Sequence, residues 1–139
     1  MSARHFLDTN VLLYSISRDA QEARKREQAI TLLDGDGAAG LSVQVLQEFY
    51  VQATRTTRRD ALPHLIAASL IRTWMRFEVQ DITISLLTLA LEIKAHHELS
   101  YWDSAVVAAA RMLGCGVLYS EDMTHGREIE GVLIANPFR

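Results

Sequence analysis

The sequence predicts an α/β protein in which a parallel sheet of four to five short strands lies between helices. Short apolar runs, suited to buried strands, alternate along the chain with longer stretches of helical periodicity. Two prolines and seven glycines among 139 residues are few, which favours a high helix content. The length fits one domain over residues 1–139.

Five segments are strand candidates because each is short and apolar. In chain order they are RHFLD (4–8), AAGLS (38–42), FEVQDI (77–82), CGVLY (115–119) and GVLIA (131–135). In parallel sheets covered by helices, ligands bind beyond the carboxyl ends of the strands. Polar residues that directly follow these runs are therefore the first candidates for a functional site.

Helices are expected between the strands, where apolar residues recur with a period near 3.6. The expected helices cover residues 21–35, 43–55, 61–76, 84–98 and 101–114. Gly35 and Gly114 are suited to end the first and the last of them, because glycine adopts the left-handed conformation that closes many helices. The expected order of strands and helices matches a sheet covered on both faces.

Composition excludes several classes of protein. The longest apolar stretch, from Ile82 to Ile93, is shorter than the ~18 residues that span a bilayer, and the first residues lack the pattern of a signal peptide. The single cysteine, Cys115, cannot form an internal disulfide and is expected to be a buried small apolar residue. The cytoplasm is therefore the expected compartment. The net charge of −3 gives no basic footprint, but it excludes no phosphate-bearing partner if several acids bind a cation.

Four acids occupy comparable places relative to the expected strands. Asp8 follows the first strand, Asp122 follows the strand 115–119, Glu48 lies in the helix after the second strand, and Asp103 lies in the first turn of the last helix. If the strands are parallel, Asp8, Glu48 and Asp122 lie near one edge of the sheet, and Asp103 joins them if its helix begins at that edge.

Each acid also has a purely structural interpretation. Asp8 precedes Thr9 and Asn10 as a helix cap would, and Asp103 closes the capping-box-like SYWD. Glu48 lies about 140° from the centre of its helix's apolar stripe, which is the place of a solvated side chain. Both interpretations stay open for each acid, and the combination of the four favours a site.

Clustered carboxylates repel one another, and a divalent cation relieves that repulsion. Oxygen ligands suit Mg²⁺ or Mn²⁺. Zinc fits less well because the five histidines show no metal-ligand spacing. Such a cation lowers the pKa of bound water and neutralises phosphoryl oxygens, which phosphodiester hydrolysis requires.

The segments FLDTNVLLY, SVQVLQEF, YWDSAVVAAA and LYSEDMTHG together resemble the PIN-domain nucleases, and most of all the VapC-type ribonuclease toxins of bacterial toxin–antitoxin pairs. The resemblance covers nearly the whole chain in order. It implies a parallel sheet between helices, and a metal site formed by Asp8, Glu48, Asp103 and Asp122. It also implies that Asn10 and Ser120 are supporting polar residues. The family pattern of Ser or Thr, any residue, then Asp selects Asp122 rather than Glu121.

The resemblance therefore implies a Mg²⁺- or Mn²⁺-dependent endoribonuclease, acting as the toxin of a type II pair. Implied partners are RNA, a small antitoxin protein and a second copy of the chain. The apolar segment 61–75 agrees with a homodimer but equally with a wide core-facing stripe. Arg55, Arg58 and Arg59 are candidates for RNA contact, although a solvated surface explains them as well.

Three other functions were weighed. A haloacid-dehalogenase-like phosphotransferase needs a second acid two residues after the first, where this chain has Asn10. A receiver-like phospho-acceptor needs an adjacent acidic pair after the first strand, which is missing. A catalytically inactive interaction module of the same fold stays possible, although the presence of all four acids argues against it.

Overall fold

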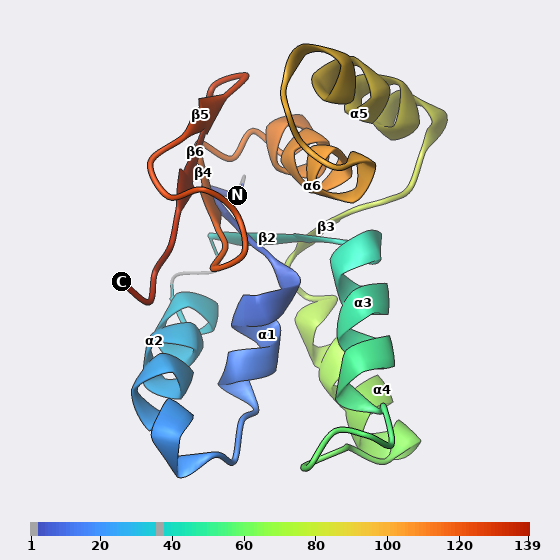
Figure 1. Cartoon of the computed structure of the whole chain (residues 1–139). Helices are drawn as coiled ribbons and strands as arrows, with labels where there is room; N and C mark the ends of the chain where they lie inside the picture. Colours follow the sequence, from blue (N-terminus) through green and yellow to red (C-terminus); the bar gives the residue numbers. More distant parts are fainter. Residues whose placement is uncertain (1–2, 36–37) are drawn as a thin grey trace.

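A computed structural model of the chain describes residues 3–35 and 38–139, in which strands and helices alternate (Figure 1). The strands are β1 (His5–Leu7), β2 (Ala39–Ser42), β3 (Glu78–Gln80), β4 (Val117–Tyr119), β5 (Glu128–Ile129) and β6 (Val132–Ala135). The helices are α1 (Thr9–Ser15), α2 (Ala23–Leu33), α3 (Val43–Ala53), α4 (His64–Trp74), α5 (Ile84–His96) and α6 (Tyr101–Met112), and a 3₁₀ turn, η1 (Ala20–Glu22), precedes α2.

The strands of the described chain form one six-stranded sheet in the order β3-β2-β1-β4-β6-β5. Every neighbouring pair is parallel except β5 and β6, which are antiparallel. The first strand of the chain is therefore central, with β2 on one side and β4 on the other. Because these three strands are parallel, their carboxyl ends lie at the same edge of the sheet.

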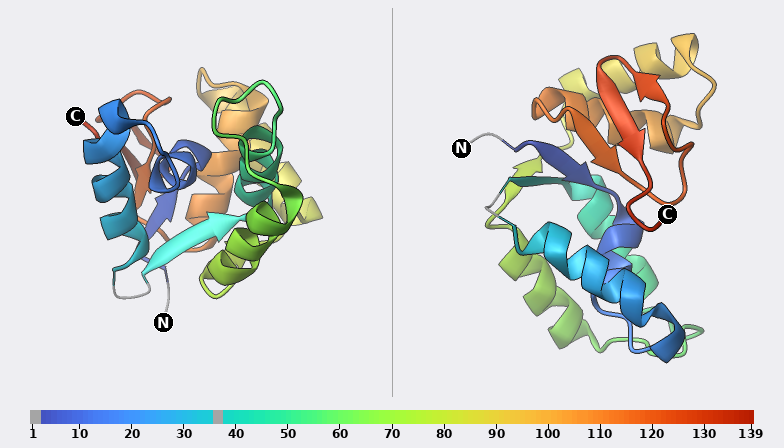
Figure 2. Two further views of the ribbon diagram at one scale, coloured as in Figure 1. Left: turned by 90° about the horizontal axis from the view of Figure 1, so that it is seen from below. Right: turned by 90° about the vertical axis from the view of Figure 1, so that its left-hand side faces the viewer.

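Helices cover both faces of the sheet, as predicted. Helices α1 to α4 lie on one side of it and α5 and α6 on the other (Figure 1), and α1 lies between α2 and α3 (Figure 2). The core between these layers includes the fully buried side chains of Phe6, Leu12, Leu41, Phe49, Leu118 and Ile134. Cys115 is also buried there, as expected.

Gly40 in β2 is required by close packing. A Cβ atom at this position would lie 2.9 Å from the side chain of Leu113 and 3.0 Å from the Cβ of Ala3. Real Cβ atoms do not make the first contact and rarely make the second, so a side chain at this position would displace the end of the Leu113 side chain and press on Ala3. This glycine thus permits the close packing of β2 against Leu113 and Ala3.

The structure corrects the predicted elements at several places. In residues 3–35 and 38–139 the sheet has six strands instead of four to five, because Glu128–Ile129 adds an antiparallel edge strand. The two-residue turn Glu130–Gly131, with φ values of 54° and 85°, closes this hairpin. Thr9–Ser15 forms a helix that was not predicted as such, and the expected helices 21–35 and 61–76 are shorter, at Ala23–Leu33 and His64–Trp74.

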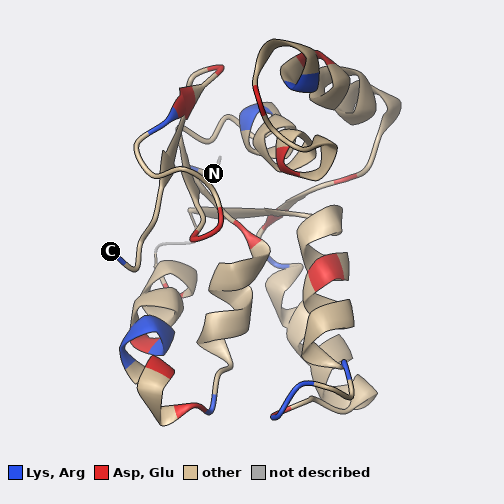
Figure 3. Cartoon of the chain, in the orientation of Figure 1, with Lys and Arg blue, Asp and Glu red and all other residues tan. Residues whose placement is uncertain are grey.

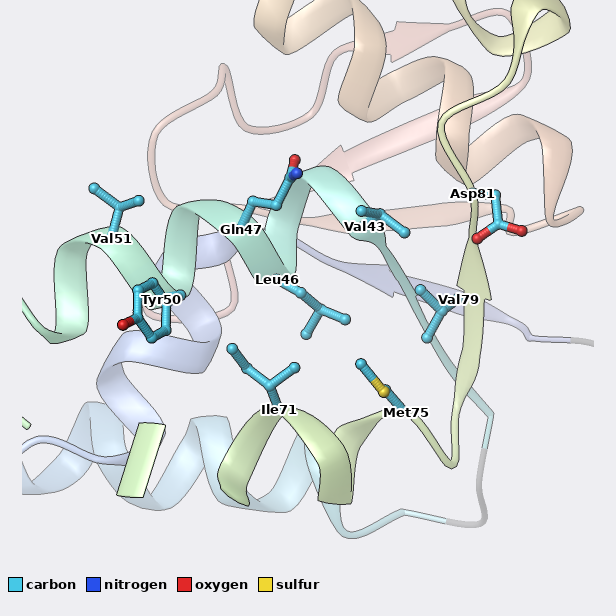
Figure 4. A pocket seen from close by; sticks show the side chains of 9 residues that line it. All are labelled: Val43, Leu46, Gln47, Tyr50, Val51, Ile71, Met75, Val79 and Asp81. Carbon is cyan, nitrogen blue, oxygen red and sulfur yellow. The ribbon is translucent and has the colours of Figure 1, made fainter. Parts of the chain in front are cut away.

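A wide apolar cavity lies between α3 and α4, away from the carboxyl ends of the central strands. It has a volume of about 590 Å³, and Figure 4 shows its lining by side chains that include Leu46, Tyr50, Ile71 and Met75. Asp81 is the one charged residue in this lining. Among the helices of the described ranges, none combines the length and the apolar character that a bilayer crossing needs.

Candidate active site

A polar cavity of about 110 Å³ lies at the carboxyl end of β1, and all four predicted acids line it. Asp8 joins β1 to α1, Glu48 lies in the second turn of α3, Asp103 in the first turn of α6, and Asp122 in the loop after β4. Figure 3 shows acidic positions in red around this junction of helices and loop. The fold therefore brings together acids that are far apart in the sequence.

Asp8 is held by hydrogen bonds at both carboxylate oxygens. Its Oδ1 accepts the backbone N–H of Thr9 at 2.8 Å, and its Oδ2 accepts the Ser120 hydroxyl at 2.7 Å. Its backbone N–H also donates to the carbonyl of Tyr119 in β4. Asp8 is thus both the cap of α1 and a wall of the cavity, so the two interpretations of this residue are compatible.

Asn10, in the first turn of α1, and Ser120, directly after β4, connect these two parts of the site, and both are buried. The Asn10 Nδ2 donates to Ser120 Oγ at 3.3 Å and to Asp122 Oδ2 at 3.2 Å. The Ser120 Oγ in turn accepts the backbone N–H of Asp122 at 3.2 Å. These bonds orient the carboxylates of Asp8 and Asp122. The family resemblance implies such a supporting role for Asn10 and Ser120.

Glu48 is half-buried rather than free in solvent. Its Oε2 accepts the Thr9 hydroxyl at 3.0 Å, and its Oε1 accepts Gln44 Nε2 at 3.0 Å. Gln44 is buried and also donates to the carbonyl of Trp102, at the start of α6. Thr9 and Gln44 are not among the residues that the sequence predicts for the site. The four-residue spacing of Gln44 and Glu48 on one helix was the available indication, because such pairs share a helix face.

Asp103 is half-buried in the first turn of α6, which Ser100 caps by accepting the Asp103 backbone N–H at 3.0 Å. The capping interpretation is therefore correct for Ser100 and the backbone. The carboxyl group of Asp103 nevertheless lines the cavity.

Glu121 is outside the cavity that Asp122 lines. Its carboxylate accepts the Tyr14 hydroxyl and Lys25 Nζ, each at 2.6 Å. Partial burial acts to raise the pKa of Glu121, but these two hydrogen bonds and the charge of Lys25 outweigh it and lower that pKa. The structure thus gives the two neighbouring acids different surroundings, and Asp122 is the exposed one that faces Asn10.

The cavity disfavours the ionised forms of Asp8 and Asp103. Burial, reinforced by the charges of Glu48 and Asp122, raises the pKa of Asp8 to about 6 against the hydrogen bonds from Ser120 and Thr9. Burial, with Asp122 and Glu48, also raises the pKa of Asp103. A cation bound among these oxygens would remove this repulsion.

The donor set fits a hard divalent cation, because it consists of carboxylate oxygens with hydroxyl and amide neighbours. In residues 3–35 and 38–139, no three His, Cys, Asp or Glu side chains are already close enough together to hold an ion. The four acids are therefore neighbours across a small cavity rather than a closed ligand cage. Mg²⁺ suits such a place because it commonly keeps several of its waters.

The three arginines predicted to contact RNA have different surroundings. Arg55 lines a shallow hollow of about 280 Å³ together with Glu48 and Gln52, both of which also line the acidic cavity. Arg58 donates from Nε to Asp60 at 2.9 Å, and Arg59 is exposed. The structure therefore places Arg55 next to the acids of the cavity, whereas Arg58 is bound to Asp60.

A parallel α/β sheet with acids gathered beyond its central strands defines a class of proteins whose ligand site lies at that edge. The chain belongs to the PIN domain family, whose model matches residues 5–127. Among curated proteins, none matches the sequence.

Solved structures share the fold over nearly their whole length. The toxin VapC20 of Mycobacterium tuberculosis, described as a Sarcin–Ricin loop cleaving toxin, is 24% identical, with a TM-score of 0.66 over 85% of this chain and 89% of that one. A toxin–antitoxin complex from Klebsiella pneumoniae is 16% identical, with a TM-score of 0.70 over 96% and 97%. DNA-bound VapBC from Salmonella typhimurium is 18% identical, with a TM-score of 0.66 over 97% and 98%.

Proposed function

We propose that the protein is a metal-dependent endoribonuclease that hydrolyses RNA phosphodiester bonds in the cytoplasm, as the toxin of a type II toxin–antitoxin pair. One observation carries the proposal: four carboxylates from four separate elements line one small cavity of a PIN-domain chain. The similar VapC20 is described as cleaving the Sarcin–Ricin loop, and two other similar structures are toxin–antitoxin assemblies.

Asp8, Glu48, Asp103 and Asp122 are the proposed ligands of Mg²⁺ or Mn²⁺. When bound, such an ion supplies water of lowered pKa and neutralises charge on a phosphoryl oxygen. The chain's own residues prepare this place. Ser120 and the Thr9 N–H fix Asp8, Asn10 fixes Asp122, and Thr9 and Gln44 fix Glu48, so little reorganisation is left for the reaction.

On the substrate side, α3 offers a row of polar side chains that leads out of the cavity. Gln44, Glu48 and Gln52 recur at intervals of four residues and so share one face of α3, and Arg55, two residues beyond the end of the helix, lines a hollow with Glu48 and Gln52. Arg55 at the outer end matches a phosphate group in charge and geometry. We propose that an RNA strand runs along this row, with Arg55 binding a phosphate next to the one that is cleaved.

The proposed partners are a small antitoxin protein and a second copy of the chain. The helix α4, which the sequence singled out for a dimer, is partly core: Ala67 and Trp74 are buried, while Leu65 and Ile66 are 76% and 51% exposed. Exposed apolar side chains on a peripheral helix support an interface. The buried side chains of this helix fit the core-facing interpretation, and the exposed ones support the interface that we propose.

Incubation of the pure protein with a panel of RNAs, with and without Mg²⁺ or Mn²⁺, tests the activity. We expect internal cleavage that stops in excess EDTA. Because an activated water is the proposed nucleophile, the 2′-hydroxyl is not needed, and the products should carry 5′-phosphate and 3′-hydroxyl ends. Cleavage that persists in EDTA, or 2′,3′-cyclic phosphate ends, would contradict the mechanism. No cleavage under any condition would favour an inactive interaction module of the same fold.

A further inference from the structure

Glu121 is held away from the acidic cavity by two residues that do not line it. Tyr14, near the end of α1, donates its hydroxyl to Glu121 Oε1 at 2.6 Å, and Lys25, in the first turn of α2, donates to Glu121 Oε2 at 2.6 Å. Lys25 also donates to the Tyr14 hydroxyl at 3.2 Å. Both carboxylate oxygens of Glu121 thus accept hydrogen bonds from side chains of α1 and α2, which lie beside the site.

Aromatic contacts support this arrangement. The Lys25 ammonium lies 4.8 Å from the centroid of the Tyr14 ring and 5.8 Å from that of Phe138. The two rings meet edge to face at 4.8 Å between centroids. A cation over two aromatic faces has fewer alternative positions than an isolated surface lysine, so its bond to Glu121 is better defined.

The backbone of Glu121 is fixed on the opposite side. Its N–H donates to Asn10 Oδ1 at 3.1 Å, while Asn10 Nδ2 donates to Asp122 Oδ2 at 3.2 Å. The same asparagine therefore binds the backbone of one acid and the carboxylate of the next. Any turn of Glu121 away from Lys25 and Tyr14 would act on both bonds of Asn10.

We infer that Lys25 and Tyr14 are positioning residues for the metal site: they hold Glu121 outside the cavity and so keep Asp122 directed at Asp8, Glu48 and Asp103. The inference rests on the proposed function in taking the acidic cavity as a cation site. Without this tether the longer Glu121 side chain is free to enter the cavity, and the loop of residues 120–122 keeps only its bonds to Asp8, Asn10 and the backbone of β6. Bound cations depend on such outer residues for ligand orientation.

The charge of Lys25 allows a positioning role to be distinguished from an electrostatic one, because the two predict opposite changes in metal affinity. Removal of a cation near four carboxylates makes the cavity more negative, which on its own strengthens binding of a divalent cation. Loss of the tether acts in the opposite direction, because the ligands are no longer held in place. A weaker metal affinity after removal of Lys25 therefore reports positioning and not charge.

The experiment measures Mn²⁺ binding to the full chain by calorimetry and by the electron paramagnetic resonance signal of free Mn²⁺. Lys25→Met should bind Mn²⁺ about three- to tenfold more weakly than the unaltered chain, less than the ~10–100-fold of residues bonded directly to a ligand, because Lys25 acts through Glu121. Tyr14→Phe, which keeps the ring, should weaken Mn²⁺ binding less than Lys25→Met does. Lys25→Arg, which keeps a cation at this position, should restore the Mn²⁺ affinity of the unaltered chain. Arg24→Met is the matched control, since Arg24 is the exposed neighbour of Lys25 on the same helix. Circular dichroism and thermal melts check that every variant is folded.

Cleavage supplies a second reading of the same variants. Lys25→Met should need more Mg²⁺ for half-maximal activity and recover most of its rate at saturating Mg²⁺. Mn²⁺ affinity of Lys25→Met equal to or above that of Arg24→Met would overturn the inference while leaving the proposed function intact. Absence of Mn²⁺ binding in the unaltered chain and in Arg24→Met would overturn the metal site itself, and the inference with it.

Discussion

Asp122 and Glu121 are neighbours in the chain, yet their side chains have different surroundings. Asp122 lines the acidic cavity, whereas Glu121 is bound by Tyr14 and Lys25. We expect Asp122→Asn to lower the rate of metal-dependent RNA cleavage by more than the ~10–100-fold that substitution of residues behind the ligands costs, because a proposed ligand is removed. Glu121→Gln should keep the greater part of the metal-dependent cleavage, since Gln still accepts the Tyr14 hydroxyl.

Initial rates of RNA cleavage at fixed Mg²⁺ give this comparison, with circular dichroism as the check on folding. The opposite ranking, in two folded variants, would show that Glu121 is the ligand in this loop.

Asp8 makes the stability of the metal-free protein depend on pH. Its pKa is raised from 3.8 to about 6 in the folded chain, so the folded state holds this proton more tightly than the unfolded state. The contribution of Asp8 to the free energy of unfolding is therefore fully present below about pH 4 and is lost as the pH rises to about 6. The loss amounts to about 3 kcal/mol at most.

Asp8→Asn cannot ionise, so its unfolding free energy should fall less than that of the unaltered chain between pH 4 and 6. Urea unfolding in EDTA at a series of pH values measures the difference. Parallel curves for the two proteins would contradict the raised pKa of Asp8.

At the scale of elements, the polar row of α3 predicts which arginine contacts RNA. Arg55 shares a hollow with Glu48 and Gln52, whereas Arg59 lines none of the described cavities next to the acids. We expect Arg55→Gln to raise KM about fivefold, equivalent to roughly 1 kcal/mol, with little change in kcat. The slope of log affinity against log salt should fall by about 0.7, as for one phosphate contact on a single strand.

Arg59→Gln is the matched control, because it removes the same charge from the same connection between α3 and α4. Equal effects of the two substitutions on KM and on the salt slope would indicate a diffuse electrostatic contribution and would remove Arg55 from the proposed strand path.

The elements also show how far the sequence determines the structure. The five predicted strands all contain observed strands, because buried parallel strands appear as short apolar runs. The edge strand Glu128–Ile129 was missed since its two residues carry too little pattern, and its turn depends on left-handed Glu130 and Gly131. The helix Thr9–Ser15 was missed because a seven-residue apolar segment suits a strand and a helix equally.

The rule that ligands bind beyond strand ends selected Asp8 and the segment Ser120–Asp122 as candidates. The family resemblance chose Asp122 over Glu121 and supported Glu48 and Asp103, whose places in their helices fit a structural role equally well. The contacts of Glu121 with Tyr14 and Lys25 span 107 and 96 residues, and no local pattern indicates such pairs. The same holds for Thr9, whose bond to Glu48 spans 39 residues.

At the scale of the whole molecule, exposed apolar side chains predict self-association. Leu65 and Ile66 on α4 are exposed, and so are Ile84, Leu87 and Leu91 along α5. Light scattering at micromolar concentration should therefore give about twice the 15.6 kDa of one chain. The double variant Leu65→Glu with Ile66→Glu should shift the mass towards one chain, because charges are costly to bury in an interface.

Thr31→Glu, an exposed position on α2, serves as the control and should leave the mass unchanged. A monomer for the unaltered chain would remove the dimer. A dimer that persists in the double variant would move the interface away from α4.

The central place of β1 has a consequence for synthesis. The ribosome makes this strand about 110 residues before its neighbour β4 and the loop that carries the last acid, Asp122. A nascent polypeptide that stops before residue 117 has neither the Tyr119 carbonyl for Asp8 nor the loop that carries Asp122. Messages that are broken before this loop therefore yield chains without the complete cavity. Whatever chemistry the cavity performs begins only after the loop that carries Asp122 has been translated.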